Sequence, residues 1–572
     1  MKVIENENLP TAKKIATPSV RTLVGYTRRV IHLGDGHTLA VFSYSHSAPA
    51  NWLFLIDGRD LSSRRFAIPN NDIASHSAAL GSDGNIYIMP YEHGRAYRFD
   101  VARETFTPID VPGLPPGELT WDALGAPDGC IYFGTYPNAC LARYDIATGK
   151  TRVWPHVAPK TSYVTGFAAD GDGVRCKAWG EDNVWLRINK TAEQPTRIAS
   201  PFSSTTGPTR KPVFVHPELA EPAWTEKVEG AEITIGHYGK LHRKDASGKV
   251  TTSKLDNGSP GGNAVMFIEA VTPTCVIGTN YSQQNLFRLD PTTGKVEEAP
   301  DMVARTPGEP MCAVALNGKA YIGIYIHSLL SVYDPEKPFK FQENPRELAE
   351  LHTQYAQTRP DGATTDGKLV FISNQSDYGK PASGTLAVID PRGGAGAEKV
   401  DAYPELIKGQ NLGPLAYDAK SGLVWGGSNR WGQMRATSPT APSAVIYAFD
   451  PAKRKVVCTL TPWEGADVVT VLGSAADGVV AATCNGQVTL VDTVKRTAAN
   501  PVAWPVPVPT YLRRGADGRA YFASGDRLWR WDVERDEVTA VAVAGGCTMV
   551  TEASPGVWVL ADSTSAYRVE VK

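Results

Sequence analysis

The sequence lacks several features that would assign its class at once. No run of about 18 consecutive apolar residues occurs, which excludes a membrane-spanning helix of ordinary length. The 58 Lys and Arg nearly balance the 60 Asp and Glu, for a net charge of −2, so the bulk charge gives no reason to expect a nucleic acid or an acidic membrane as partner. The first residues, MKVIENENLPTAKK, carry no apolar stretch after their charges and so predict no secretory signal. We therefore expect a cytoplasmic protein, or a secreted or periplasmic protein whose leader has been removed.

The eight cysteines show no metal-ligand spacing. They form no CxxC motif and no Cys/His cluster. Cys130 and Cys140 flank one expected hairpin, CIYFGTYPNAC, and could face each other in an oxidising compartment, although small buried residues in strands are the favoured interpretation. The cysteines therefore identify no metal site, a divalent metal stays an open possibility, and no nucleotide cofactor is expected.

One pattern recurs along the chain: a small apolar strand, a turn containing glycine, a second strand, a polar loop, and a third strand that ends in Asp. The turn glycines Gly84, Gly129, Gly173 and Gly318 each precede a closing residue by 16 positions, at Asp100, Asp145, Asn189 and Asp334. Most steps between closing residues are 40–45 positions. The full series is Asp57, Asp100, Asp145, Asn189, Asp245, Asp290, Asp334, Asp390, Asp450, Asp492 and Asp532.

This repeat predicts an all-β fold of stacked propeller blades. Asp-Gly and Asn-Gly suit the positive φ angles of a two-residue hairpin turn, and flanks such as NIYIMP and CIYFGT are rich in β-branched and aromatic residues. The closing Asp starts another turn, toward a fourth outer strand. A period of about 40–50 residues with four strands is typical of a propeller blade. Since one blade cannot bury both of its faces, neighbouring blades must stack, and we expect about twelve four-stranded blades.

Two tandem β-propellers accommodate twelve blades better than one wide ring. We expect two rings of six or seven blades, with residues 1–300, including the N-terminal segment, in the first propeller and 301–572 in the second. Residues 201–230 are rich in proline and form either an insertion or a linker.

The order of strands in a blade places the chemically active residue types on one face. The Asp-Gly turns join first and second strands, so the loops between second and third strands lie on the opposite face, with the connections between blades. The position seven residues after the turn glycine is Tyr91, Tyr136 and Tyr325, and Tyr281 and Tyr378 occupy the analogous loops. Tyrosines at repeated blade positions can also simply pack on the next blade, with the hydroxyl in water.

We expect a ligand site on this loop face. Tyr and Trp rings with Arg, Asn and Asp suit sugars, whose C–H faces stack on aromatic rings while their hydroxyls bind polar groups. The candidate catalytic residues are His76, Tyr91, His93, Tyr325, His327, His352 and Arg359. The candidate substrate-binding residues are Tyr136, Asn138, Tyr281, Gln283, Asp377, Tyr378, Arg430 and Trp431.

Blades of the type GTYPNACLARYDIATGK resemble the propellers of streptogramin lyase and of gluconolactonase-like proteins, and those of polysaccharide and oligogalacturonide lyases. The resemblance is one of repeat style over nearly the whole chain. It implies β-elimination beside a carboxylate or ester, in which His or Tyr removes the α-proton and Arg, His or a metal stabilises the enolate. One stretch, ARYDIATGKTRVW, is similar to a quinoprotein blade repeat, but the other blades lack the matching Trp, so no quinone is expected.

The leading hypothesis is a carbohydrate-active propeller, a lyase rather than a hydrolase, which acts on a uronate-containing oligosaccharide or polysaccharide. The first rival is a non-catalytic scaffold that binds a protein or glycan through the same face. The second rival is a lactone hydrolase with a channel metal, for which Glu309 and Asn411 are candidate ligands. In each case a carbohydrate, protein or small-molecule partner is expected rather than a nucleic acid or membrane, and the sequence does not indicate the oligomeric state.

Overall fold

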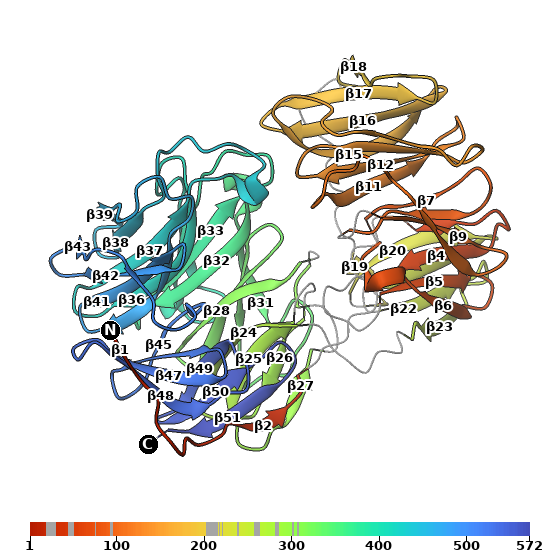
Figure 1. Ribbon diagram of the computed structural model, residues 1–572. Helices are drawn as coiled ribbons and strands as arrows, with labels where there is room; N and C mark the ends of the chain where they lie inside the picture. The colour runs from red at the N-terminus through yellow and green to blue at the C-terminus, as the bar shows by residue number, and fades with distance from the viewer. Residues whose placement is uncertain are drawn as a thin grey trace. The chain divides into compact units, whose positions relative to one another are not determined.

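A computed structural model describes most of the 572-residue chain. The described residues are 1–18, 30–43, 51–74, 76–91, 95–201, 215–216, 218–219, 221–236, 239–256, 264–280, 285–299, 303–305 and 308–571. In these ranges the chain forms twelve sheets of four or five strands, each built mainly from antiparallel pairs of consecutive strands (Figure 1). The predicted all-β class and the predicted number of about twelve blades are confirmed.

The repeated turn residues shape each blade as the sequence pattern requires. Gly84 and Gly129 both have φ of 77°, a left-handed conformation that favours glycine. The Asp before each of these glycines accepts a hydrogen bond from a tyrosine four residues later, Tyr87 to Asp83 at 2.9 Å and Tyr132 to Asp128 at 2.7 Å. The Asp–Gly–x–x–Tyr pattern therefore ties the hairpin turn to the second strand of the blade.

The closing Asp residues cap the turn toward the fourth strand. Asp145 Oδ1 accepts the backbone N–H groups of Ala147 and Thr148 at 3.0 and 3.2 Å. Asp290 Oδ1 accepts those of Thr292 and Thr293 at 2.8 and 3.2 Å. These bonds satisfy turn amides that the strands leave unpaired.

The chain divides into two compact units, Met1–Val20 with Gly262–Lys572 and Arg21–Gly261. We call the first the seven-bladed unit and name each blade by its innermost strand. These strands are β24 (Val265–Thr272), β28 (Pro310–Leu316), β32 (Gln357–Thr365), β36 (Asn411–Asp418), β40 (Thr470–Ala476), β45 (Arg513–Arg514) and β49 (Met549–Ser554). Successive innermost strands contact one another, and β49 contacts β24, so the seven blades form a closed ring.

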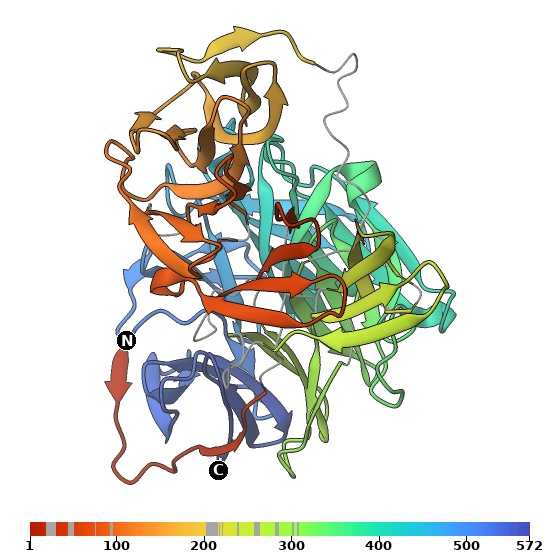
Figure 2. The same cartoon turned by 90° about the vertical axis from the view of Figure 1, so that its right-hand side faces the viewer.

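The N-terminal segment completes two blades of this ring. Strand β2 (Lys13–Ala16) pairs antiparallel with β51 (Ala566–Glu570) and becomes the outer strand of the β49 blade. Strand β1 (Lys2–Ile4) pairs in parallel with β48 (Glu537–Val543) at the edge of the β45 blade. Figures 1 and 2 show this segment in red beside the blue C-terminal strands.

The other unit contains five sheets, and we call it the five-sheet unit. Their first strands are β3 (Ile31–His32), β7 (Ala78–Leu80), β11 (Leu119–Gly125), β15 (Thr161–Asp170) and β19 (Val215–His216). Buried clusters join the sheets pairwise in the spatial order β15, β11, β7, β3 and β19.

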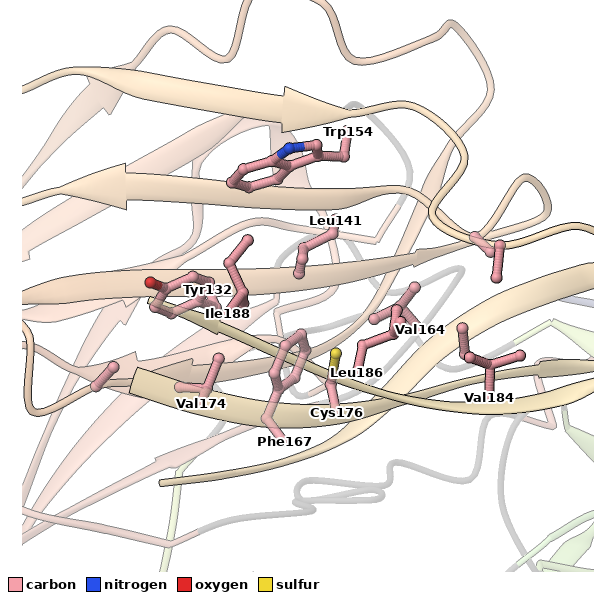
Figure 3. Packing of buried hydrophobic residues seen from close by; sticks show 14 of the residues in the cluster. Tyr132, Leu141, Trp154, Val164, Phe167, Val174, Cys176, Val184, Leu186 and Ile188 are labelled. Atoms are coloured by element: carbon pink, nitrogen blue, oxygen red, sulfur yellow. The ribbon is translucent and has the colours of Figure 1, made fainter. Parts of the chain in front are cut away.

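Figure 3 shows one of these interfaces, between the β11 and β15 sheets. Tyr132 and Leu141 of the first sheet pack on Val164 and Leu186 of the second, and all four are at most 2% exposed. Each sheet thus covers the face of its neighbour, which is how a blade that cannot bury both faces alone becomes stable.

The grouping of blades differs from the predicted domains, which were 1–300 with the N-terminal segment and 301–572. The compact units separate near residue 262, hold seven and five sheets, and place residues 1–20 with the C-terminal blades. The physical reason is the pairing of β1 and β2, whose backbone hydrogen bonds are made to strands more than 500 positions away in the sequence.

Helix is scarce in the described ranges. The α-helix α1 (His352–Tyr355) covers four residues, and no helix among the described residues has the length and apolar character needed to cross a membrane. The cysteines are free, and Cys130 and Cys140 are both buried, as expected. Cys130 begins strand β12 (Cys130–Tyr136), whereas Cys140 directly precedes β13 (Leu141–Asp145) rather than lying in a strand.

Candidate functional site

A β-bulge near the start of strand β32 sets the direction of Arg359. The pairing of β32 with β33 (Val370–Ser376) shifts between Gln357 and Arg359, so Thr358 is the extra residue. Bulges re-aim side chains and are frequent beside functional sites. The same shift recurs at the start of β15, β24 and β28, so the bulge is part of the repeat, whereas the arginine is particular to this blade.

Arg359 and two tyrosines form the centre of the candidate site. Tyr325 follows β29 (Lys319–Ile324) and Tyr378 lies two residues beyond β33. The two tyrosine hydroxyls are 2.8 Å apart, and Arg359 Nη2 donates to Tyr378 Oη at 3.3 Å. The Arg359 guanidinium also lies 4.3 Å from the centroid of the Tyr325 ring. Two blades thus contribute one guanidinium and two phenols to a single hydrogen-bonded group.

One buried and one half-buried carboxyl group flank this centre. Glu309, which directly precedes β28, is 5% exposed, and its Oε2 has no hydrogen-bond partner among the described residues. Burial raises the pKa of Glu309, and the charge of Arg359 opposes the rise. Burial likewise raises the pKa of Asp361, against a hydrogen bond from Gln375 Nε2 at 3.1 Å and the charge of Arg359.

The groups around Arg359 stabilise the charged form of its guanidinium. Burial works against the charged guanidinium, but Tyr378, Tyr325 and Glu309 outweigh it and hold the pKa of Arg359 above its ordinary value. The site therefore presents a permanent cation that is partly shielded from water, and such a cation interacts with an anion more strongly than a fully solvated one does.

A histidine–aspartate pair stands beside Tyr378. His352 Nε2 lies 2.9 Å from Asp377 Oδ2, and the Tyr378 backbone N–H donates to Asp377 Oδ1 at 2.8 Å. The His327 ring stacks on His352 with centroids 4.5 Å apart. The structure thus brings together six of the predicted site residues: Tyr325, His327, His352, Arg359, Asp377 and Tyr378.

Arg430 and Trp431 lie in the long loop of the neighbouring β36 blade. Arg430 Nε donates to Asp467 Oδ1 at 2.8 Å, and its Nη1 donates to the Pro442 carbonyl at 2.9 Å. The Trp431 carbonyl accepts from Asn411 Nδ2 at 3.0 Å. Arg430 is thus already bound to Asp467, and the loop it lies in joins the β36 blade to the candidate site.

Gln433 of this loop connects it to Arg359 and was not singled out from the sequence. With its amide oxygen turned toward the guanidinium, Gln433 accepts from Arg359 Nε at 2.6 Å and donates to the Ser376 carbonyl at 2.9 Å. Gln433 is 3% exposed. Arg430 and Trp431 had already marked this loop as a candidate in the sequence. The spacing of residues along the loop, however, does not indicate which of its side chains contacts Arg359.

The five-sheet unit holds a second group of predicted residues in a row of rings. His76 stacks on Trp121 with centroids 5.2 Å apart, and Tyr91 lies 5.9 and 5.7 Å from these two rings. Tyr136 stacks on Tyr163 at 4.3 Å. Trp121 contacts Tyr163 at 5.7 Å, and Tyr163 stacks on Trp179 at 4.2 Å, so the row runs across three blades.

Trp121 and Tyr163 were also missed by the sequence reasoning. Both are the third residue of their innermost strand, as Arg359 is of β32. A comparison of blades by strand position, rather than by loop position, would therefore have found them.

The remaining predicted residues fall outside both groups. Asn138 Nδ2 donates to the buried Glu118 at 2.5 Å, and its carbonyl oxygen contacts His156 Nδ1 at 2.7 Å, so its polar groups support the loop itself. His93, Tyr281 and Gln283 lie outside the described residues.

Of the two residues proposed for a channel metal, Glu309 interacts with a cation and Asn411 is hydrogen-bonded through both its side-chain oxygen and its amide nitrogen. Glu309 faces Arg359, and Asn411 Oδ1 accepts the backbone N–H of Ser376 at 2.8 Å while its amide nitrogen binds the Trp431 carbonyl. Across the described part of the chain, no three His, Cys, Asp or Glu side chains are grouped as metal ligands.

Comparison with known proteins adds no family. No protein-family model matches the chain, and no curated protein matches it significantly. A chain of the mitotic checkpoint complex aligns at 14% identity and a TM-score of 0.40, over 54% of this chain and 90% of that chain. The extracellular domain of a protein assigned to a one-component system of B. thetaiotaomicron aligns at 11% identity and a TM-score of 0.38, over 100% and 82%. Another such domain, assigned to a hybrid two-component system of that organism, aligns at 11% and 0.37, over 96% and 81%. Similarities of this size carry no information on what the chain binds.

Proposed function

We propose that the Arg359 site of the seven-bladed unit binds the carboxylate of a uronate-containing saccharide and catalyses β-elimination. The observation that carries this proposal is the hydrogen-bonded group of Arg359, Tyr378 and Tyr325, with hydroxyls 2.8 Å apart and a guanidinium 3.3 Å from one of them. A fixed cation suits a carboxylate, and two phenols beside it can accept and donate a proton.

The reaction needs one base, one acid and a charge to stabilise the intermediate. One tyrosine, as phenolate, takes the proton α to the carboxylate, and the resulting enolate is stabilised by Arg359. The electron pair then forms a carbon–carbon double bond, the bond to the glycosidic oxygen breaks, and the other tyrosine protonates that oxygen. Proton transfer across the Tyr325–Tyr378 hydrogen bond restores the starting state, so no water is consumed.

The surrounding residues have positioning roles in this scheme. Asp377 holds the Tyr378 backbone and the His352 ring through its two carboxylate oxygens, and His327 stacks on His352. Gln433 fixes the orientation of the Arg359 guanidinium. Such support is needed because a catalytic group displaced by about 1 Å loses much of its effect.

The first test is the formation of an unsaturated product. The protein is incubated with a panel of uronate-containing oligosaccharides while the ultraviolet absorbance of the new double bond is followed. We expect Y378F and R359K each to lower kcat by roughly 100-fold or more. Tyr417, in β36 and outside the site, supplies the matched control Y417F, which should retain kcat. Absence of product across the panel would reject the lyase proposal.

Non-catalytic binding of a saccharide is the second candidate, and the aromatic row of the five-sheet unit favours it. Six rings, from His76 to Trp179, contact one another across three blades. Tyr91, Trp121 and Trp179 are the partly exposed members of this row, and exposed aromatic rings stack on the C–H faces of sugars. Saccharide binding that persists without any unsaturated product, and that W121A abolishes while R359K does not, would support this function instead.

A further inference from the structure

The loop between β37 (Leu423–Asn429) and β38 (Ile446–Asp450) is pinned to the neighbouring β32 blade. Thr437 Oγ1 donates to the Lys380 carbonyl at 2.9 Å, and Gln433 donates to the Ser376 carbonyl at 2.9 Å. A Cβ atom at Gly432 would collide with Thr437 Oγ1 of the same loop and would lie 2.9 Å from the Lys380 carbonyl oxygen of the β32 blade, so the approach depends on glycine. The loop is therefore held in one place beside the candidate site.

Gln433 makes this loop part of the wall around Arg359. Its amide oxygen lies 2.6 Å from Arg359 Nε, and the side chain is buried. The backbone next to Gln433 is consequently held close to the guanidinium at the centre of the site.

Arg435, two residues further on, is a second cation at this wall. Its side chain is 63% exposed, and its Nη2 lies 3.2 Å from Asp467 Oδ2. The guanidinium also stands 4.9 Å from the Trp431 ring centroid. Met434 and Arg435 have φ of 53° and 56°, a left-handed conformation that is unfavourable for such residues and needs support from the surrounding structure. The backbone thus presents Arg435 to solvent at an energetic cost.

The charges of the loop leave a positive excess. Asp467 accepts from Arg430 at 2.8 Å and from Arg435 at 3.2 Å, so one carboxylate serves two guanidiniums. The Trp431 indole together with Arg430 holds the pKa of Asp467 below its ordinary value, which keeps this carboxylate ionised at neutral pH. Arg430 is further bound to the Pro442 carbonyl, and Arg435 is the more exposed of the two arginines.

We propose that Arg435, on Trp431, is a second anion-binding point of the Arg359 site, so that the ligand carries at least two acidic sugar residues in one chain. This inference rests on the proposed function, since it assigns the second carboxylate of the same saccharide. Arg359 takes the carboxylate at the reacting residue, and Arg435, which stands over the Trp431 ring, takes a carboxylate further along. The preferred ligand is then a polyuronate segment rather than a neutral glycan with one uronate.

The test compares ligands of one and several uronate residues. Binding of a uronate monosaccharide and of the corresponding oligosaccharides is measured by titration calorimetry with wild type, R435Q, R435K and R392Q. We expect R435Q to weaken oligosaccharide binding by roughly tenfold, to leave monosaccharide binding unchanged, and R435K to restore most of the loss. Arg392, exposed and paired with Asp390 at 2.5 Å, lies outside the site and supplies the matched control.

The outcomes separate the two proposals. If R435Q binds the oligosaccharides as wild type does, while R359K weakens both ligands, the second anion point is refuted and the Arg359 site stands. If wild type binds neither ligand, the proposed function fails first. Equal losses in R435Q and R392Q would attribute the effect to general surface charge and would also overturn the inference.

Discussion

Glu309 is a buried carboxyl group whose ionisation lowers the stability of the folded protein. A carboxyl group that is 5% exposed and has an unpartnered oxygen among the described residues is costly to ionise. Its place beside Arg359 offsets only part of that cost, because burial still raises its pKa. Ionisation of Glu309 in the folded protein therefore costs free energy even beside Arg359.

This environment predicts a pH dependence of stability. The folded pKa of Glu309 is raised, whereas an unfolded chain has a glutamate pKa of about 4.3. Between these two values the folded state holds a proton that the unfolded state has released. The stabilisation is complete below the unfolded pKa and is lost as pH rises through the folded pKa, with a slope of at most about 1.4 kcal/mol per pH unit.

The variant E309Q removes this titration. We expect its free energy of unfolding, measured by urea denaturation from about pH 4 to pH 8, to fall less steeply with pH than that of wild type. D366N, at a partly exposed turn position whose carboxylate accepts the backbone N–H groups of Lys368 and Leu369, controls for the loss of one carboxylate. Parallel curves for wild type and E309Q would show that Glu309 carries no such proton.

At the scale of elements, the pairing of β2 with β51 depends on a close approach of two backbones. Gly294, in the turn after β26 (Phe287–Leu289), has φ of 73°, and a Cβ added there would collide with the Ile15 carbonyl. Gly294 of the turn DPTTGK therefore has two roles: it adopts the left-handed conformation, and it leaves room for the N-terminal segment.

A matched pair of substitutions separates these two roles. Gly422 also has a positive φ, 67°, and donates to an Asp carbonyl four residues earlier as Gly294 does, but has nothing within 4 Å of an added Cβ. We expect G422A to cost about 1–2 kcal/mol and G294A to cost about 1–3 kcal/mol more because of overpacking. Thermal and urea unfolding of the two variants would measure the difference, and equal losses would contradict the close packing at Ile15.

At the scale of the molecule, the seven-bladed unit closes through a charged pair as well as through strands. Arg513 Nη2 of the β45 blade donates to Glu269 Oε2 of the β24 blade at 2.6 Å. Glu269 Oε1 also accepts the Ala315 backbone N–H of the β28 blade at 3.2 Å. The pair therefore links the last blades of the ring to the first ones.

A double-mutant cycle tests this closure. R513M leaves the buried Glu269 unpaired, and we expect it to destabilise the protein by about 3 kcal/mol, near the low end for a buried pair because Arg513 is partly exposed. R513M/E269L should be much closer to wild type, since the charge is removed with its partner. Urea unfolding gives both values. A double variant as unstable as the single one would place the effect in packing instead.

The sequence by itself determined the blade. The spacing of Gly129 and Asp145, the tyrosine that follows each Asp-Gly turn, and the face shared by the loops of Tyr325 and Tyr378 all follow from local backbone geometry. A hairpin, its turn and its cap are made within about 40 residues, so a single stretch of sequence carries all their determinants.

Only the tertiary structure decided how blades are grouped and which loop residues meet. Strands β1 and β2 pair with the C-terminal strands, and Gln433 contacts Arg359. Both are contacts between segments that lie far apart in the sequence. The division into units also places His76 and Tyr325 in different units. The energy of these contacts depends on packing and closure of a whole ring, which no local pattern of residues encodes.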